Sequence, residues 1–310
     1  AIHRGRVNYE PNSLAGGCPF QAGAAQGFVS VAAKNASHAD QAKVRAKPEK
    51  FADHYTQATL FYDSQTPLEQ AHIAAAFRFE LSKLTVPAIR ERMVASLRNV
   101  SEALAAQVAA GLGMASLPEP MPCAMATPPE PELRLSPALS LLARPGDGGI
   151  QGRKIAILVA DGVVGQSAAD IHAALVAQGA APRFVAPRIG PVNTADGVPI
   201  VADASLENEP GVLFDALAIA EGKAAVAELA RHGQTLDNIK DQYRHCKPML
   251  VLADAKTLLK MAGVPMALAN GEPDPGLIVA AGAKPKVLKQ FIGAIAAHRH
   301  SARETDPPRI

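Results

Sequence analysis

The sequence predicts an α/β protein in which an extended arm and a small helical domain precede a doubly wound parallel sheet. Two observations lead to this prediction. From residue 151 onward, apolar strand-like runs alternate with amphipathic helical segments, which is the pattern of parallel strands joined by crossover helices. A run rich in proline and glycine over residues 115–150 separates this half from a shorter helical stretch at residues 51–114.

Residues 1–50 are expected to form an extended wrapping arm. Glycine and proline are scattered through them, and no apolar period is long enough to build a core element. A segment of this length without its own core is ordered by a neighbour in the sequence or in a partner subunit. The chain opens with Ala1-Ile2-His3-Arg4, without a signal-like apolar run, so we expect a fragment of something longer.

The first helix of the helical domain is predicted by a start signal at Thr66-Pro67-Leu68-Glu69. Thr66 is expected to cap the helix, Pro67 to occupy its first position and Glu69 to complete a capping box. Apolar residues at helical spacing follow, so this helix is expected to run to about Leu84.

Two more short helices are expected before residue 114. Pro87 opens one of them, with Ile89, Met93 and Leu97 on its apolar face, and Ser101 caps the other. A cluster of roughly 60 residues buries too little surface to be stable alone. These helices therefore require another domain to pack against.

Residues 115–150 hold eight prolines and are expected to form a largely extended interdomain linker. The sheet domain, residues 151–310, is expected to contain five parallel strands with helices between them. The strands are expected at Lys154–Ala160, Arg183–Ala186, Ala216–Ala220, Pro248–Ala253 and Leu277–Ala280. The helices are expected at residues 168–178, 222–231, 235–245, 255–262 and 285–299.

Composition excludes several classes of function. Lys and Arg number 31 against 29 Asp and Glu, a balance that does not support a nucleic-acid partner. Apolar stretches are interrupted well before the roughly 20 residues that span a bilayer, so no membrane partner is expected. The cysteines Cys18, Cys123 and Cys246 are far apart and odd in number, which favours reduced thiols in a cytoplasm.

Ligands of such sheets bind at the carboxyl ends of the strands. The segments there begin with Asp161, Glu221 and Asp254, and they contain neither a GxGxxG nor a phosphate-loop motif, so dinucleotide or NTP binding has little support. Asp161 and Asp254 would both lie at this edge and could do acid–base work as a pair. Capping of the helices that follow explains each of them as well, and we favour that interpretation.

A nucleophile elbow would need Ser or Cys in the turn that closes the fourth strand, but that turn holds Leu252-Ala253-Asp254. Cys246 lies before the strand and is expected to be a structural thiol, although His245 beside it could in principle form a pair with it. His298 and His300 are expected on the surface of a frayed, polar C-terminus. No catalytic, cofactor-binding or metal-binding residue is assigned.

Four stretches of the first half carry a resemblance to a known family. Arg6–Ser13, Phe51–Ala58, Phe61–Thr66 and Ala76–Lys83 closely resemble the segment of haem catalases that follows the haem-bearing barrel. The sheet domain resembles the extra C-terminal domain of large-subunit catalases. That domain is flavodoxin-like, and it is similar to class I glutamine amidotransferases and to DJ-1/PfpI proteins.

The resemblance implies a haem protein that, at full length, disproportionates hydrogen peroxide to water and oxygen as a cytoplasmic homotetramer. In that parent, this part would stabilise the oligomer and guard access to the haem held by the barrel domain. The family's distal His and Asn and its haem-ligating Tyr precede the wrapping loop, so none of them maps onto this chain. The chain alone, including its tyrosines at 9, 55, 62 and 243, is expected to bind no haem.

The resemblance to DJ-1/PfpI enzymes places Leu252 at their nucleophilic Cys and Ser167 at their supporting Glu. It therefore implies a vestigial pocket in the sheet domain. Two alternatives stay open: a stand-alone, non-enzymatic module that binds unfolded chains, and, less favoured, a residual hydrolase or amidotransferase.

Overall fold

The computed structural model describes residues 45, 47, 49–127, 129–143, 148–308 and 310. The chain divides into two units, Ala1–Ala52 and Asp53–Ile310. The arm predicted for residues 1–50 lies outside the described residues, apart from 45, 47 and the start of the short 3-10 helix η1 (Glu49–Ala52).

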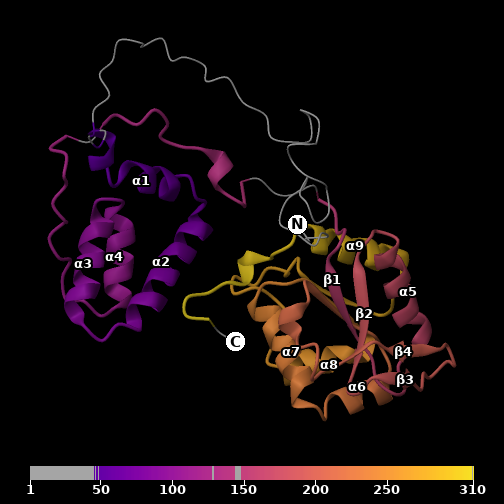
Figure 1. Ribbon diagram of the computed structural model, residues 1–310. Coiled ribbons are helices and arrows are strands. Elements are labelled where there is room, and N and C mark those ends of the chain that lie inside the picture. Colours follow the sequence, from indigo (N-terminus) through magenta and orange to yellow (C-terminus); the bar gives the residue numbers. More distant parts are fainter. Residues whose placement is uncertain (1–44, 46, 48, 128, 144–147, 309) are drawn as a thin grey trace, which may run out of the picture. The chain divides into compact units, whose positions relative to one another are not determined.

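The second unit begins with α-helices (Figure 1). Their bounds are α1 Thr56–Asp63, α2 Pro67–Ser82, α3 Pro87–Arg98 and α4 Glu102–Gly111. The start signals of the last three are confirmed, including the capping box of Thr66 and Glu69 and the N-cap at Ser101. Sequence reasoning missed α1, whose first turn is held by the carboxylate of Asp53, the acceptor of the Thr56 N–H at 3.1 Å.

The helices pack around a small apolar core, and the face predicted for α3 is confirmed at Leu97 but wrong at Ile89 and Met93. The core residues of α3 are Val94 and Leu97, whereas Ile89 and Met93 are each 39% exposed. α3 buries a different side from the one predicted, because that side faces α4, its main packing partner. The other core members are Tyr62, Ala74, Leu81, Leu104, Ala105, Val108 and Ala109.

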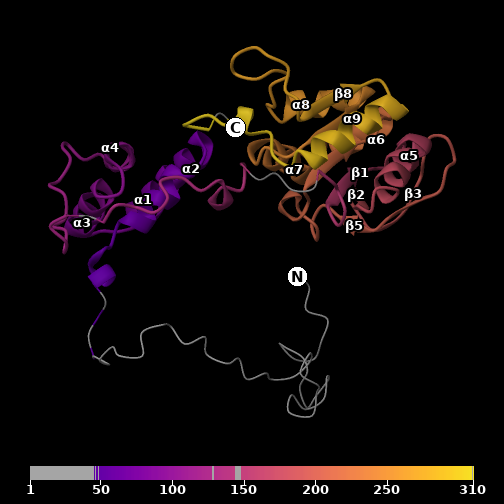
Figure 2. The same cartoon turned by 90° about the horizontal axis from the view of Figure 1, so that it is seen from above.

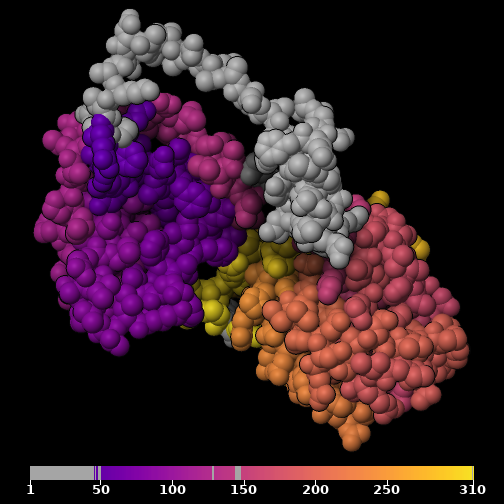
Figure 3. Space-filling model, in the orientation of Figure 1, coloured from indigo at the N-terminus to yellow at the C-terminus, as the bar shows by residue number. Residues whose placement is uncertain are grey.

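The proline-rich segment after α4 has one short regular element in its described part, η2 (Pro137–Leu139). It is nevertheless held against the helices, and together they form one body, indigo to magenta in Figure 3. Glu69 is the main anchor: its carboxylate accepts hydrogen bonds from Ser140 Oγ at 2.7 Å and from the Leu141 N–H at 3.0 Å. A second contact joins this segment to α3, where the Met121 backbone N–H donates a hydrogen bond to the carbonyl oxygen of Ala95.

The second half of the chain folds around a six-stranded, parallel sheet in the order β5-β2-β1-β6-β7-β8, which confirms the predicted α/β class. The five predicted strands are present as β1 Lys154–Leu158, β2 Ala181–Ala186, β6 Ala216–Ile219, β7 Met249–Leu252 and β8 Leu277–Ala280. Three short strands were missed, namely β3 Gly190–Val192, β4 Ile200–Ala202 and β5 Ala204–Ser205.

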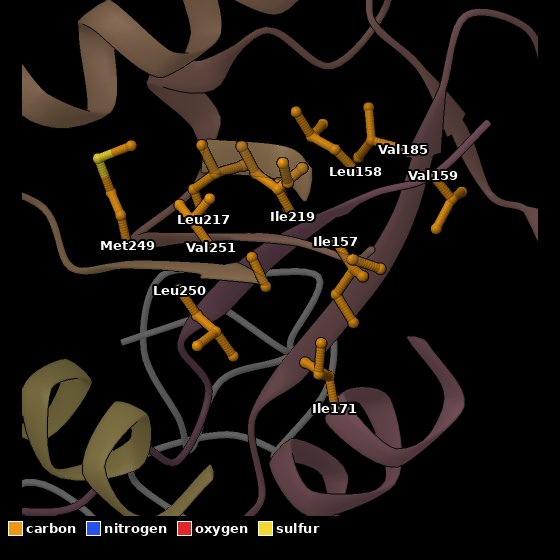
Figure 4. Packing of buried hydrophobic residues seen from close by; sticks show 14 of the residues in the cluster. Ile157, Leu158, Val159, Ile171, Val185, Leu217, Ile219, Met249, Leu250 and Val251 are labelled. Atoms are coloured by element: carbon orange, nitrogen blue, oxygen red, sulfur yellow. The ribbon is translucent and has the colours of Figure 1, made fainter. Parts of the chain in front are cut away.

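Helices cover both faces of this sheet. α5 and α9 lie together on one face, and α6, α7 and α8 lie on the other (Figures 1 and 2). Their bounds are α5 Gly165–Val176, α6 Lys223–Leu229, α7 Gly233–Arg244, α8 Lys256–Met261 and α9 Pro285–Ala296. The central strands are therefore buried on both sides, and their aliphatic side chains form the core shown in Figure 4.

The end of the chain is packed into this domain rather than frayed, which corrects the sequence prediction. The Arg303 side chain is 1% exposed and pairs with Asp274 at 2.5 Å. It also donates to the carbonyl of Lys247 at 2.6 Å. His300 is buried, not on the surface, and its ring lies 3.1 Å from the carbonyl of Ala294.

Candidate functional site

The sheet has one topological switch point, between β1 and β6, where ligands of doubly wound folds bind. The loops that leave these two strands touch each other. Gly222 adopts φ +141°, and a Cβ at this position would lie 2.4 Å from the carbonyl oxygen of Gly162. Only glycine fits there, so the crevice between the loops is closed by backbone.

A half-buried acid lies beside this contact. Glu221 follows β6, and its Oε1 accepts a hydrogen bond from Ser167 Oγ of α5 at 2.5 Å. Its Oε2 is buried without a hydrogen-bond partner among the described residues. A Cβ on Gly282, in the loop after β8, would lie 3.6 Å from Oε1, so the carboxyl group reaches across the end of β7. Sequence reasoning named Ser167 and Glu221 separately but did not pair them.

The turn that closes β7 has the geometry of a nucleophile elbow. Ala253 has φ +40°, directly after the strand and at the start of η4 (Ala253–Ala255), which leads into α8. The resemblance to DJ-1/PfpI enzymes implied Leu252 at the nucleophile position. This is wrong, because Leu252 is a fully buried residue of β7. The elbow residue is Ala253, whose methyl group has no nucleophilic atom. The described elbow therefore cannot carry covalent acyl transfer.

The two aspartates at this edge are not brought together. β6 lies between β1 and β7, so Asp161 and Asp254 follow strands roughly 10 Å apart. The capping interpretation is also wrong: the N-cap residues of α5 and α8 are Val164 and Ala255, and neither aspartate caps the helix that follows it. Asp161 instead accepts the Asn193 backbone N–H at 2.9 Å, and this bond lowers the pKa of Asp161.

The start of α5 is capped by a residue far away in the sequence. Asp196 accepts the backbone N–H groups of Gly165 and Gln166, each at 2.9 Å, and the bond from Gln166 lowers the pKa of Asp196. This helix end is where an anion such as phosphate would bind in such a fold. The protein's own carboxylate occupies it, which accounts for the lack of a phosphate-binding motif in the β1 loop.

Cys246 lies at the other edge of the sheet, just after α7, and it is buried as predicted. Desolvation, together with the charge of Glu304, raises the pKa of its thiol to about 11. The contacts of the sulfur are the carbonyl of Arg244 at 3.9 Å and Glu304 Oε1 at 3.7 Å. A thiol in this environment is not a nucleophile at neutral pH.

The described residues hold neither a metal-ligand cluster nor a membrane-spanning helix. No group of three or more His, Cys, Asp or Glu side chains there is arranged to hold a metal ion. In the same part of the chain, no helix combines the length and the apolar character that crossing a membrane requires.

Fold and site together define a doubly wound, flavodoxin-like α/β domain whose nucleophile elbow carries no nucleophile, preceded in the chain by a small helical cluster. Two family models match the same two parts. The model described as catalase-related immune-responsive matches residues 48–112. The model of the C-terminal domain found in long catalases matches residues 151–305, half of the chain. The chain belongs to the long catalases and corresponds to their C-terminal part, as the resemblance implied.

Individual relatives agree with this assignment. Catalase HPII of Pseudomonas putida is 38% identical over 307 residues, covering 98% of this chain and 40% of the relative. Catalase C of Rhizobium meliloti (strain 1021) is 40% identical over 267 residues, covering 86% of this chain and 37% of the relative. Catalase HPII of Mycobacterium avium is 34% identical over 318 residues. The chain thus spans about 40% of the length of the curated relatives it matches.

Proposed function

We propose that this chain is the C-terminal part of a haem catalase that disproportionates hydrogen peroxide to water and oxygen. The observation that carries the proposal is the extent of the match to catalases. It runs through 98% of the chain, so it includes both the helical cluster and the sheet domain. If this chain shared a single domain with catalases, the match would be confined to that domain.

Neither Tyr62 nor Tyr243 fits as an axial haem ligand, so in this proposal haem is held by another part of the protein. A haem site of this kind needs an axial ligand facing a cavity that also holds a distal base. Tyr62 is enclosed in the helical core. Tyr243 borders a cavity of about 530 Å³, but its neighbours in that wall include Arg244 and Arg303 and no histidine.

The role of this part in the parent would be structural. The helical cluster exposes large apolar side chains, among them Phe61, Phe79, Ile89 and Met93, which a barrel domain or a partner subunit in a homotetramer would cover. We further propose a wrapping arm at 1–50, a helical domain at 51–114, a linker at 115–150 and a domain at 151–310 that guards access to the haem. Both described cysteines are free thiols, in keeping with a cytoplasmic protein.

A second candidate function rests on the same exposed side chains. A stand-alone module that binds unfolded chains would need such an apolar surface in its final state, without a covering domain. A residual hydrolase is less favoured, because the elbow residue is Ala253.

The test is to isolate the protein that carries this sequence from its native source and to measure its intact mass, its Soret absorbance and its release of oxygen from peroxide. We expect a polypeptide more than twice as long as 310 residues, with haem and rapid oxygen release. A native product of 310 residues without haem would contradict the proposal. If that product also suppressed aggregation of an unfolded test protein, the second candidate would replace it.

A further inference from the structure

A second cavity, of about 390 Å³, opens at the carboxyl edge of the sheet. It lies between the ends of β1 and β2, the turn that leads into β3, and α6. Neither Ala253 nor Glu221 is among its lining residues, so it is separate from the elbow. Its position, at the carboxyl edge of the sheet and next to the switch point, and its volume are those of a small-molecule site.

The wall of this cavity combines an apolar floor with three charged groups. Ala160, Val192 and Ala224 supply apolar surface, and Asp161, Glu228 and Arg188 supply charge. Asp161 is fixed by two hydrogen bonds from Asn193, at 2.9 and 3.1 Å. Hydrogen bonds lower the pKa of both Asp161 and Glu228, so both carboxylates are ionised at neutral pH.

Arg188 is only loosely paired. Its side chain is 80% exposed, and its Nη2 lies 3.4 Å from Asp161 Oδ2. A close charge-assisted hydrogen bond is about 2.7–2.9 Å long. The cavity therefore presents a fixed negative group and an exposed, weakly paired positive group side by side, next to an apolar surface.

We propose that this cavity binds an α-amino acid with a small apolar side chain. Such a molecule carries an ammonium and a carboxylate on one carbon. The ammonium meets Asp161 and Glu228, the carboxylate meets Arg188, and the side chain lies on Val192 and Ala224. A simple cation would compete with Arg188 for Asp161, and a simple anion would face two carboxylates. The zwitterion is the class that offers a group of opposite charge to all three side chains, in addition to the pairs that Glu228 makes with Arg231 and His232.

The test is an NMR titration of the full chain with L-valine, followed at the Val192 and Ala224 methyl groups. Two matched ligands each lack one charge: isobutylamine has no carboxylate, and 3-methylbutanoate has no ammonium. We expect saturable shifts with valine, and binding weaker by about tenfold or more for either analogue, because each loses a charge-assisted hydrogen bond.

Two variants complete the test. Arg188→Gln is expected to weaken valine binding by about tenfold without lowering the unfolding temperature, since its side chain is largely exposed. Arg231→Gln is the matched control: Arg231 pairs with Glu228 but is not a lining residue, so binding should change by less than about twofold. The proposal is wrong if valine causes no saturable shift, if either analogue binds as tightly as valine, or if Arg188→Gln binds like the control.

Discussion

The Asp196 carboxylate accepts the backbone N–H of Gly165 at 2.9 Å, although the two residues are 31 positions apart in the sequence. This contact ties the loop after β3 to the first turn of α5. It places a negative charge at the positive end of the helix dipole, where doubly wound folds bind phosphate. A Cβ on Gly165 would lie 2.8 Å from that same carboxylate oxygen, so a larger residue there would displace the Asp196 side chain from the helix end.

Replacement of Asp196 by Ala should loosen the start of α5. Loss of a helix cap costs about 1–2 kcal/mol, and hydrogen exchange of the α5 amides should rise accordingly. Added inorganic phosphate should slow this exchange again in the variant, by occupying the vacated helix end. Asp170→Ala is the control, because that side chain accepts a hydrogen bond from Gln166 Nε2 on the same helix and does not cap it. Equal exchange in the two variants would contradict the role given to Asp196.

Glu69 should make the anchoring of the proline-rich segment depend on pH. Burial alone would raise its pKa, but hydrogen bonds from Thr66, Ser140 and Leu142 lower the pKa to about 2. A carboxylate with a depressed folded pKa stabilises the fold above its unfolded pKa, near 4.5, and this contribution is lost as the pH falls towards 2. Exchange of the Leu141 and Leu142 amides, measured relative to the rate of an unprotected amide at the same pH, should therefore become faster over that range.

The variant Glu69→Gln should show that faster exchange already at pH 7. The matched control is Glu80→Gln on the same helix, whose carboxylate pairs only with exposed Lys83. The role of Glu69 would be refuted if the Leu141 and Leu142 amides stayed as protected in Glu69→Gln as in the control.

Ala253→Gly should stabilise the sheet domain. A non-glycine residue at positive φ costs about 1 kcal/mol, and glycine removes that strain. The same substitution two residues later, Ala255→Gly, should destabilise by a similar amount, because Ala255 is buried with ordinary helical angles, φ −62° and ψ −18°. Urea denaturation of both variants measures the two changes. Destabilisation by both substitutions would argue against strain at the elbow.

Cys246 should resist alkylation. With a thiol pKa of about 11, only about one thousandth of the group is thiolate at pH 8. Peptide mapping after iodoacetamide treatment of the folded chain should find Cys123, which is exposed, modified and Cys246 intact. Modification of Cys246 at a rate like that of Cys123 would show that the thiol is accessible and activated.

Arg303→Met should destabilise the sheet domain strongly. The substitution leaves Asp274 as a buried carboxylate without its ionic partner, which costs about 3–5 kcal/mol. Arg134→Met removes a comparable but exposed pair with Glu130 and should change the free energy of unfolding by less than about 1 kcal/mol. Thermal unfolding of both variants gives the comparison. Similar unfolding temperatures would mean that the end of the chain is not an integral part of the domain.

Several features were determined by the sequence alone, because their causes lie within a few residues. The capping box of Thr66 and Glu69 is a contact between residues three apart, and the structure contains it. The alternation of apolar strands and amphipathic helices after residue 151 led to the observed sheet, since strands buried on both faces must be continuously apolar. The catalase resemblance rested on continuous motifs, and the family assignment confirmed it.

Only the tertiary structure decided the features that depend on residues distant in the sequence. Asp196 caps α5 from another loop, the Arg303 pair buries a chain end that looked polar and frayed, and Glu221 meets Ser167 across the switch point. Local sequence patterns do not predict such pairs. The sequence around a polar side chain is the same whether that side chain forms its hydrogen bonds with water or with a distant residue. The elbow was misplaced by one residue, from Ala253 to Leu252, for a related reason. A positive φ at alanine is imposed by the strand and helix that the turn must join, not by any preference of the residue itself.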